Sequence, residues 1–208
     1  MQVIILSWEF PPRMVGQLAD YVMRLAHQLV KNDVETHVVT YHDYLTGQHK
    51  ESEGVNTTRV SNPVRTHIGV LTWVLTLNQE VVRAASNIYH ESNKMVDLID
   101  VHDWHFLQSA VTLKKAFDIP FVFSVESLEE HRSHGANFPF NMAIKSLEWL
   151  GLYEAKRAIV KSEWMRDEVV RLYRVPVEKI VVIKPRSKTW IPEVLEAYRN
   201  VVGGSSSK

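Results

Sequence analysis

The sequence predicts an α/β protein built on one doubly wound, mostly parallel sheet with helices on both faces. Two observations predict this Rossmann-like fold. Short apolar runs alternate along the chain with longer segments whose apolar residues recur at helical spacing. The first of these runs is rich in β-branched residues and almost entirely apolar, as strands are when helices cover both faces of a parallel sheet. With 208 residues, of which 45% are hydrophobic, the chain is long enough to close one such domain.

The chain begins with a strand, a helix and a second strand. Residues 3–8 are apolar apart from Ser7, and Pro11 and Pro12, which follow them, disfavour both ladder pairing and a helix. Apolar residues at helical spacing predict a helix over about 16–32, and residues 36–40 predict the second strand. This order is that of a right-handed βαβ unit.

The rest of the chain continues the alternation. Further strands are predicted at 55–60, 96–101, 121–123, 158–160 and 179–183. Further helices are predicted at 70–88, 106–113, 141–156 and 163–173. The polar segments 42–53 and 126–137 predict surface loops.

A last amphipathic helix is predicted after the final strand. Thr189 is its expected N-cap, and Pro192 falls in the first turn, where proline is tolerated. Its apolar face consists of Trp190, Val194, Leu195, Tyr198 and Val201. We therefore expect a domain over residues 1–184, a helix within 185–202 that packs back on it, and a flexible Gly- and Ser-rich tail over 203–208.

Composition excludes several classes of function. Twenty-four basic residues balance twenty-four acidic ones, which argues against a polycationic nucleic-acid binder. The absence of cysteine removes disulfides, thiolate metal sites and thiol nucleophiles. The apolar runs are too short to span a membrane, and Met1 leads directly into a strand rather than a signal peptide. We expect a cytoplasmic protein that contacts neither nucleic acid nor membrane.

Three segments at the carboxyl ends of predicted strands carry unusual residues, and ligands of open parallel sheets bind at that edge. The first contains Gly16 and Gln17, where the first helix begins. A glycine at this place lets an anionic ligand approach the free helix amides, although a lone glycine more often belongs to a plain turn. No G-x-G-x-x-G or Walker loop is present, which argues against a conventional dinucleotide or P-loop site.

The second segment is His102, Asp103, Trp104 and His105. Polar groups beside an indole could form a sugar subsite, with the ring facing the sugar. Two histidines also raise the possibility of a metal, but a third ligand at helical spacing is missing, so we expect none. In a purely structural interpretation, Asp103 caps the following helix and Trp104 fills the core.

The third segment runs from Glu126 through Glu129 to Arg132. So many ionisable side chains in seven residues often mark a solvated loop. The carboxylates of Glu126 and Glu129 could instead perform acid–base chemistry. That chemistry depends on the distance between them, which the sequence does not give. No Gly-x-Ser-x-Gly motif supports a serine hydrolase.

Several motifs together resemble the amino-terminal half of glycogen and starch synthase-like glycosyltransferases of the GT-B fold, in the group of families 4 and 5, and most closely its archaeal members. The resemblance covers residues 1 to about 184. Its motifs are Ser7-Trp8-Glu9-Phe10-Pro11-Pro12 with Val15-Gly16, Val101-His102-Asp103-Trp104, Glu129-x-x-Arg132-x-x-Gly135, Ser146-Leu147-Glu148-Trp149 and Ser162-Glu163-Trp164-Met165.

The resemblance implies a role for each singled-out residue. His102 and Asp103 would be catalytic and would line the sugar subsite. His105, Glu126, Glu129 and Arg132 would bind the acceptor sugar, and Gly16 and Gln17 would lie in the loop beside the phosphates of the donor. No resident cofactor is implied.

The sequence departs from the family pattern in three ways. Gln17 stands where the family usually has a second glycine, and Glu126 stands where it generally has a histidine. The nucleotide-sugar domain is missing, because Ile183 is followed by the terminal helix, which resembles the helix that returns to the first domain in full GT-B enzymes.

Three functions therefore remain open. The chain is an acceptor-side domain that needs another polypeptide, a stand-alone carbohydrate-binding or interaction module, or a small transferase with a remodelled donor site. We expect a maltooligosaccharide-like acceptor to bind, and a nucleotide sugar only once a second domain completes the site. The open cleft face is expected to meet a partner chain or a second copy.

Overall fold

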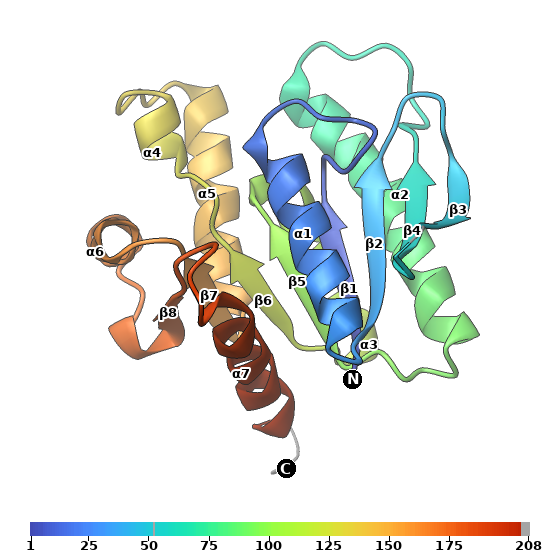
Figure 1. Ribbon diagram of the computed structural model, residues 1–208. Helices are drawn as coiled ribbons and strands as arrows, with labels where there is room; N and C mark the ends of the chain where they lie inside the picture. Colours follow the sequence, from blue (N-terminus) through green and yellow to red (C-terminus); the bar gives the residue numbers. More distant parts are fainter. Residues whose placement is uncertain (52, 205–208) are drawn as a thin grey trace.

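The computed structural model describes residues 1–51 and 53–204 (Figure 1). Within them, one sheet has the strand order β3-β4-β2-β1-β5-β6-β7-β8. Neighbouring strands are parallel except β3, which pairs antiparallel with β4. The fold is therefore the predicted mostly parallel α/β sheet. Its strands are β1 (Gln2–Ser7), β2 (Glu35–Tyr41), β3 (Gly47–Lys50), β4 (Asn56–Val60), β5 (Leu98–His102), β6 (Phe121–Ser124), β7 (Arg157–Val160) and β8 (Ile180–Val182).

Helices cover both faces of this sheet, as Figure 1 shows. On one face lie α1 (Gln17–Lys31) and α7 (Trp190–Gly203), and on the other lie α2 (Val70–Glu91), α3 (Leu107–Phe117), α5 (Pro139–Glu154) and α6 (Glu163–Tyr173). Three short helical turns complete the set: η1 (Trp104–Phe106), α4 (Glu129–Arg132) and η2 (Val177–Lys179).

The pleat of β1 shows why the strands read as continuous apolar runs. Val3 and Ile5 belong to the core beneath α1 and α7, whereas Ile4 and Leu6 belong to the core on the opposite face. All four side chains are fully buried. Each face of the sheet thus has its own core, and the terminal helix closes one of them.

The terminal helix packs on the domain as predicted. Every residue of its predicted apolar face is buried, and α7 contacts α1, β5 and β6. Thr189 stands at the N-cap position, as predicted. Its side chain makes no capping hydrogen bond, however, so the predicted side-chain cap is wrong. The helix includes Gly203, which the sequence predicts to lie in the flexible tail; residues 205–208 lie outside the described residues.

Two segments predicted as loops contain regular structure. Segment 42–53 includes the edge strand β3, whose four residues are all exposed. Segment 126–137 includes the single turn α4, and its first residue, Glu129, is buried rather than solvated. In both cases the element is short and is held by neighbouring chain rather than by an apolar pattern of its own.

The register of the strands brings the candidate residues together. Ser7, the last residue of β1, lies opposite His102, the last residue of β5, and His102 lies opposite Ser124 at the end of β6. The residues that follow these strands therefore share one edge of the sheet. Among the described helices, none is both long and apolar enough to cross a membrane.

Candidate functional site

A cleft of about 570 Å³ lies at the carboxyl edge of the sheet. The segments that follow β1, β5, β6, β7 and β8 contribute to its lining, together with the first turns of α1. This is the edge at which open parallel sheets bind ligands. The lining residues are Trp8, Glu9, Gln17, Leu18, Tyr21, Asp103, Glu126, Ser127, Lys161, Pro185 and Arg186.

Beneath this cleft, His102 is held between two carboxylates. Its Nε2 lies 3.1 Å from Asp100 Oδ2, and its Nδ1 lies 3.0 Å from Glu126 Oε1. The ring is fully buried. Burial lowers the pKa of His102, but Asp100 and Glu126 outweigh it and raise the pKa to about 9. The imidazole is therefore charged at neutral pH, and both of its nitrogens are used within the protein.

Each carboxylate of this network has further donors. Asp100 accepts hydrogen bonds from Ser124 Oγ, at 2.7 Å, and from the hydroxyl of Tyr198 on α7. Glu126 accepts one from Lys161 Nζ, which also lies 4.1 Å from the ring centre of Tyr21. Two carboxylates thus face one imidazolium and one ammonium, so that buried charges are paired rather than isolated. Glu126 and Lys161 form the part of this network that reaches the cleft.

Asp103 lies directly in the cleft wall. Its backbone has a φ of +63°, a strained conformation for a residue other than glycine. Its carboxylate accepts a hydrogen bond from Trp104 N at 2.9 Å and so caps the turn η1, while Trp104 is buried. Burial raises the pKa of Asp103 to about 7, against the opposing effect of Arg132. Backbone strain and a near-neutral carboxyl in a cleft are together typical of a functional group.

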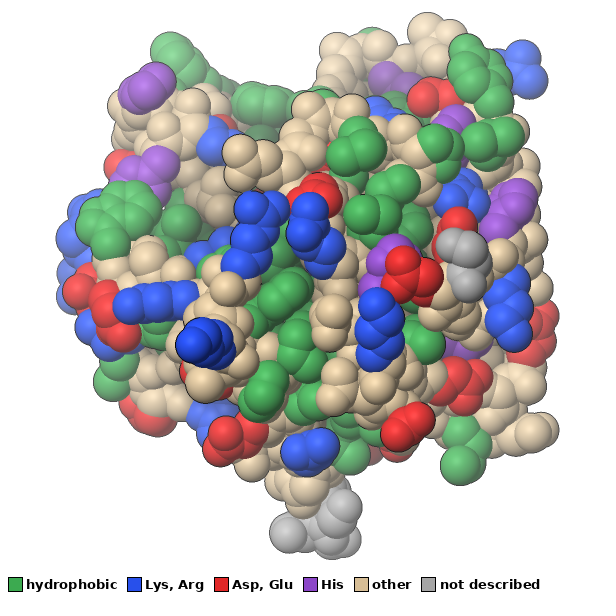
Figure 2. Space-filling view, in the orientation of Figure 1, with side chains coloured by type: hydrophobic (Ala, Val, Ile, Leu, Met, Phe, Trp, Pro, Cys, Tyr) green, Lys and Arg blue, Asp and Glu red, His purple; other side chains and the backbone are tan. Residues whose placement is uncertain are grey.

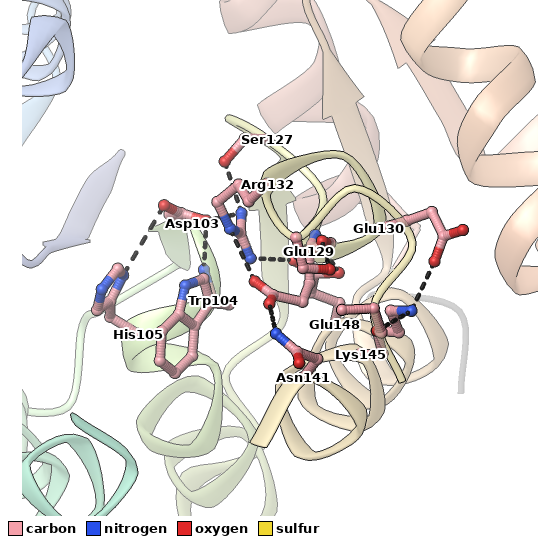
Figure 3. Close-up of polar contacts among 12 residues, drawn as sticks. Asp103, Trp104, His105, Ser127, Glu129, Glu130, Arg132, Asn141, Lys145 and Glu148 are labelled. Carbon is pink, nitrogen blue, oxygen red and sulfur yellow. Dashed lines mark hydrogen bonds and ion pairs between the residues drawn. The ribbon is translucent and has the colours of Figure 1, made fainter. Parts of the chain in front are cut away.

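Arg132 organises a second charged cluster beside Asp103 (Figure 3). Its guanidinium donates to Glu148 Oε1 at 2.6 Å, to Glu129 Oε2 at 3.0 Å and to Ser127 Oγ at 2.6 Å. Its Nη1 also lies 3.6 Å from Asp103 Oδ1. Glu129 and Glu148 are buried, and Glu148 accepts from the backbone N–H of Glu129. The cluster fixes the turn α4 against α5 and positions Arg132 behind the cleft wall.

His105 is enclosed by aromatic rings. It stacks on Trp8 at a centroid distance of 4.6 Å and on Trp104 at 4.2 Å. Burial, together with the charges of Arg132 and Arg13, lowers the pKa of His105 to about 3, so the ring is neutral. His105 therefore supports Trp8, which itself lines the cleft.

The amides at the start of α1 already have an acceptor. Glu9 Oε2 accepts hydrogen bonds from Val15 N at 2.7 Å and from Gly16 N at 2.8 Å, and Glu9 is buried. A Cβ at Gly16 would lie 3.6 Å from Glu9 Oε1. The carboxylate thus occupies two amides of this loop, while Gln17 lines the cleft.

The structure brings only part of the predicted set to the cleft surface. Gln17, Asp103 and Glu126 line it, whereas His102, His105, Glu129 and Arg132 lie behind these residues. Within the described residues, no three His, Asp or Glu side chains meet as metal ligands would. The roles assigned to the predicted residues remain predictions.

Sequence reasoning overlooked two charged residues in the cleft, Lys161 and Arg186. A signal for Lys161 was available, because it immediately follows β7 and the rule that selected His102 and Glu126 applies equally to it. Arg186 follows β8 at a greater distance and pairs with Asp20 of α1 at 3.0 Å. Only the return of the chain toward α7 places it at the cleft.

Comparisons with known proteins decide the family. The model of the family described as Glycosyltransferase Family 4 matches residues 18–185. The chain belongs to glycosyltransferase family 4. It is 32% identical over 192 residues to an uncharacterized glycosyltransferase of Methanocaldococcus jannaschii, covering 91% of this chain and 47% of that protein. It is 25% identical over 198 residues to a glycogen synthase of Mycobacterium tuberculosis, covering 88% of this chain and 48% of that protein.

The fold agrees with this family. A sucrose-phosphate synthase structure from Thermosynechococcus elongatus superposes with a TM-score of 0.68 at 16% identity, covering 99% of this family 4 chain and 100% of that structure. The architecture is that of a Rossmann-like domain of a GT-B glycosyltransferase. The chain spans about half the length of the two sequence relatives.

Proposed function

We propose that this chain is the acceptor-binding half of a glycosyltransferase that extends a glucan from a nucleotide sugar. The observation that carries the proposal is the cleft at the carboxyl edge, where Asp103 combines a strained backbone with a pKa near neutrality. A half-ionised carboxyl both accepts hydrogen bonds from sugar hydroxyls and donates them. Trp8 supplies the apolar part of the wall that a sugar ring needs. The glycogen synthase relative supports a glucan as the acceptor.

Every predicted site residue except Gly16, whose amide Glu9 holds, then has a part in one assembly. Asp103 and Glu126 contact the acceptor, and Gln17 lies on the donor side of the cleft. His102 positions Glu126 through the 3.0 Å contact. Arg132 and Glu129 position Asp103 and Ser127 from behind, and His105 positions Trp8. These four are positioning residues.

The donor sugar is proposed to bind chiefly to the half of the enzyme that this chain does not contain. The chain spans about half of its relatives, and Glu9 rather than a ligand holds the amides of Val15 and Gly16. Exposed apolar side chains occur in the loop before α1 and at the start of α5, where Met14 is 59% and Phe138 is 72% exposed, and such residues favour a covering partner. We propose that a second domain or a partner chain covers the cleft, with a second copy of this chain as the alternative.

A titration with maltotriose tests the acceptor site. The wild-type chain should bind with a Kd in the millimolar range, about 4 kcal/mol, since only half of the cleft desolvates the sugar. Asp103→Asn should weaken binding about tenfold, because the strained carboxyl is lost while the shape is kept. Asp118→Asn, at the left-handed C-cap of α3, is the matched control and should bind as the wild type does. Equal affinities in all three proteins would remove Asp103 from the acceptor site.

A second candidate function is a carbohydrate-binding or interaction module without catalysis, and one observation favours it: His102 has no free nitrogen to offer a reaction. A single-turnover assay with radiolabelled nucleotide glucose and maltoheptaose separates the two. The chain alone should give no product under either candidate, whereas transfer restored by adding the missing half would exclude the module. Product formed by the chain alone would instead establish a remodelled transferase.

A further inference from the structure

A second pocket, of about 400 Å³, lies at the same edge of the sheet as the cleft. Segments that follow β2 and β4 and the first turns of α2 form it. Its aromatic part consists of Tyr41, Tyr44 and Trp73, and its polar part includes Asp43, Asn62 and Arg65. No residue singled out from the sequence lies in this pocket.

The aromatic part offers both a fixed ring and an open one. Tyr41 is buried and meets Trp73 edge to face at a centroid distance of 4.8 Å, so this corner is rigid. Tyr44 is 89% exposed, which is unusual for so large an apolar ring. An exposed ring above a rigid aromatic corner suits a flat ligand with an apolar face, such as a pyranose.

The polar part retains free hydrogen-bonding capacity. Asn62 is already satisfied, because its amide donates to Trp73 O at 2.8 Å and accepts from Val64 N and Thr76 Oγ1. Asp43 accepts from the Tyr41 hydroxyl, yet its side chain is still 52% exposed. Ligand hydroxyls can therefore reach a carboxylate and the exposed Arg65 without breaking the bonds that hold the pocket.

One residue, Arg13, joins this pocket to the cleft. Its guanidinium carbon lies 5.0 Å from the ring centre of Trp8, which lines the cleft, and 4.9 Å from that of Tyr41, which lines the second pocket. Its Nε lies 4.0 Å from Asp43 Oδ2. Its Nη1 is buried without a hydrogen-bond partner within the described chain. The Arg13 side chain as a whole is 22% exposed, so its accessible atoms can contact a ligand that passes between the two pockets.

We propose that a long glucan acceptor runs from the cleft past Arg13 into this second pocket, which binds sugar units remote from the reacting end. The inference rests on the proposed function, because it requires that the reacting end of the acceptor bind in the cleft. It adds that the pocket selects acceptors by length: chains too short to pass Arg13 gain nothing from it. The charges favour a neutral glycan over a polyanion, since Asp43 accompanies Arg65 in the pocket and lies beside Arg13.

The test compares Kd values for maltotriose and maltoheptaose. The wild-type chain should bind maltoheptaose about tenfold more tightly than maltotriose. This gain in affinity is what one or two further contacts between a sugar ring and an aromatic ring would provide. Tyr44→Ala and Arg65→Ala, two exposed positions whose replacement leaves the core intact, should each remove about fivefold of the maltoheptaose affinity and leave maltotriose binding unchanged. Tyr153→Ala, at a tyrosine that is 65% exposed on α5, is the matched control and should bind both sugars normally.

The outcomes separate this inference from the proposed function. If maltotriose binds and depends on Asp103 but maltoheptaose binds no more tightly, the second pocket is overturned and the cleft stands. The second pocket is equally overturned if the length-dependent gain survives in both pocket variants. If neither sugar binds, the proposed function fails and the inference fails with it. Loss of maltoheptaose affinity in the Tyr153→Ala control as well would show that another surface binds the sugar chain.

Discussion

Asp103 and His102 are neighbours in the sequence, but their side chains face opposite directions, one toward the cleft and the other into the protein. His102 is the last residue of β5, points into the protein, and is held charged by Asp100 and Glu126. Asp103 leaves the strand with a positive φ, faces the cleft, and is kept near half-ionisation by burial. The Asp103 carboxyl is therefore available to a ligand, whereas the His102 imidazolium contributes a buried positive charge beneath the cleft.

The charged state of His102 predicts a loss of stability at alkaline pH. The folded pKa of about 9 exceeds the ordinary value of about 6.5, so the stabilisation is complete below about pH 6.5 and disappears as pH rises through about 9. Between pH 7.5 and 9.5 the free energy of unfolding should fall by about 2 kcal/mol in urea titrations.

Most other groups with shifted pKa values act outside this window; burial lowers the pKa of Lys179, but its effect on stability has the opposite sign. The raised pKa of Asp103 changes stability only below about pH 7, and the sequence contains no cysteine to titrate above it. Tyr21 and Tyr41, whose pKa values burial raises, add their own effect only above about pH 10. An unfolding free energy that stays constant from pH 7.5 to 9.5 would show that His102 is neutral in the folded protein.

At this scale the sequence predicts where functional residues gather but not which of them reach solvent. His102, Glu126 and Asp103 are predicted because each follows or ends a strand. Whether a side chain faces the cleft depends on tertiary partners such as Tyr198, which lies 98 positions from Asp100 along the chain. No local pattern contains that information.

At the scale of elements, α7 joins the end of the chain to the floor of the site. Its buried face closes the core that contains Val3, Ile5, Leu98 and Val122, and its Tyr198 hydroxyl donates to Asp100. The helix therefore contributes both apolar burial and one of the hydrogen bonds that stabilise the buried carboxylate.

Removal of residues 187–208 should consequently destabilise the domain. Exposure of the face beneath α7 should lower the free energy of unfolding by several kcal/mol, on the scale of burying a few large side chains. Glu196→Ala, on the exposed face of the same helix, is the control and should change stability by no more than about 0.5 kcal/mol. A thermal melt unaffected by the deletion would mean that α7 does not dock on its own chain in solution.

The elements most easily predicted are those with a buried face. The central strands and α1, α2 and α7 carry strong apolar patterns, and the structure confirms them. Strand β3 has no such pattern because all four of its residues are exposed at the sheet edge. Turn α4 is set by Arg132, Glu129 and Glu148, which meet only when α5 packs against it. Elements held by distant polar contacts leave little local signal.

At the scale of the whole molecule, one edge of the sheet carries both the cleft and the second pocket. Acidic and basic side chains are interspersed over the face that Figure 2 shows, in keeping with the formal net charge of zero. This face therefore has no field of a single sign. Under the proposed function, recognition of a neutral glycan rests on the local groups at the carboxyl edge.

Backbone chemical-shift mapping of the ¹⁵N-labelled chain with maltotriose tests the central claim most directly, because it detects millimolar binding and locates it. Acceptor binding at the cleft predicts shifts that cluster on Trp8, Gln17, Asp103, Ser127 and Lys161, which five separate segments bring together. Shifts confined to other surfaces, or none at saturating sugar, would contradict the assignment of this cleft to the acceptor.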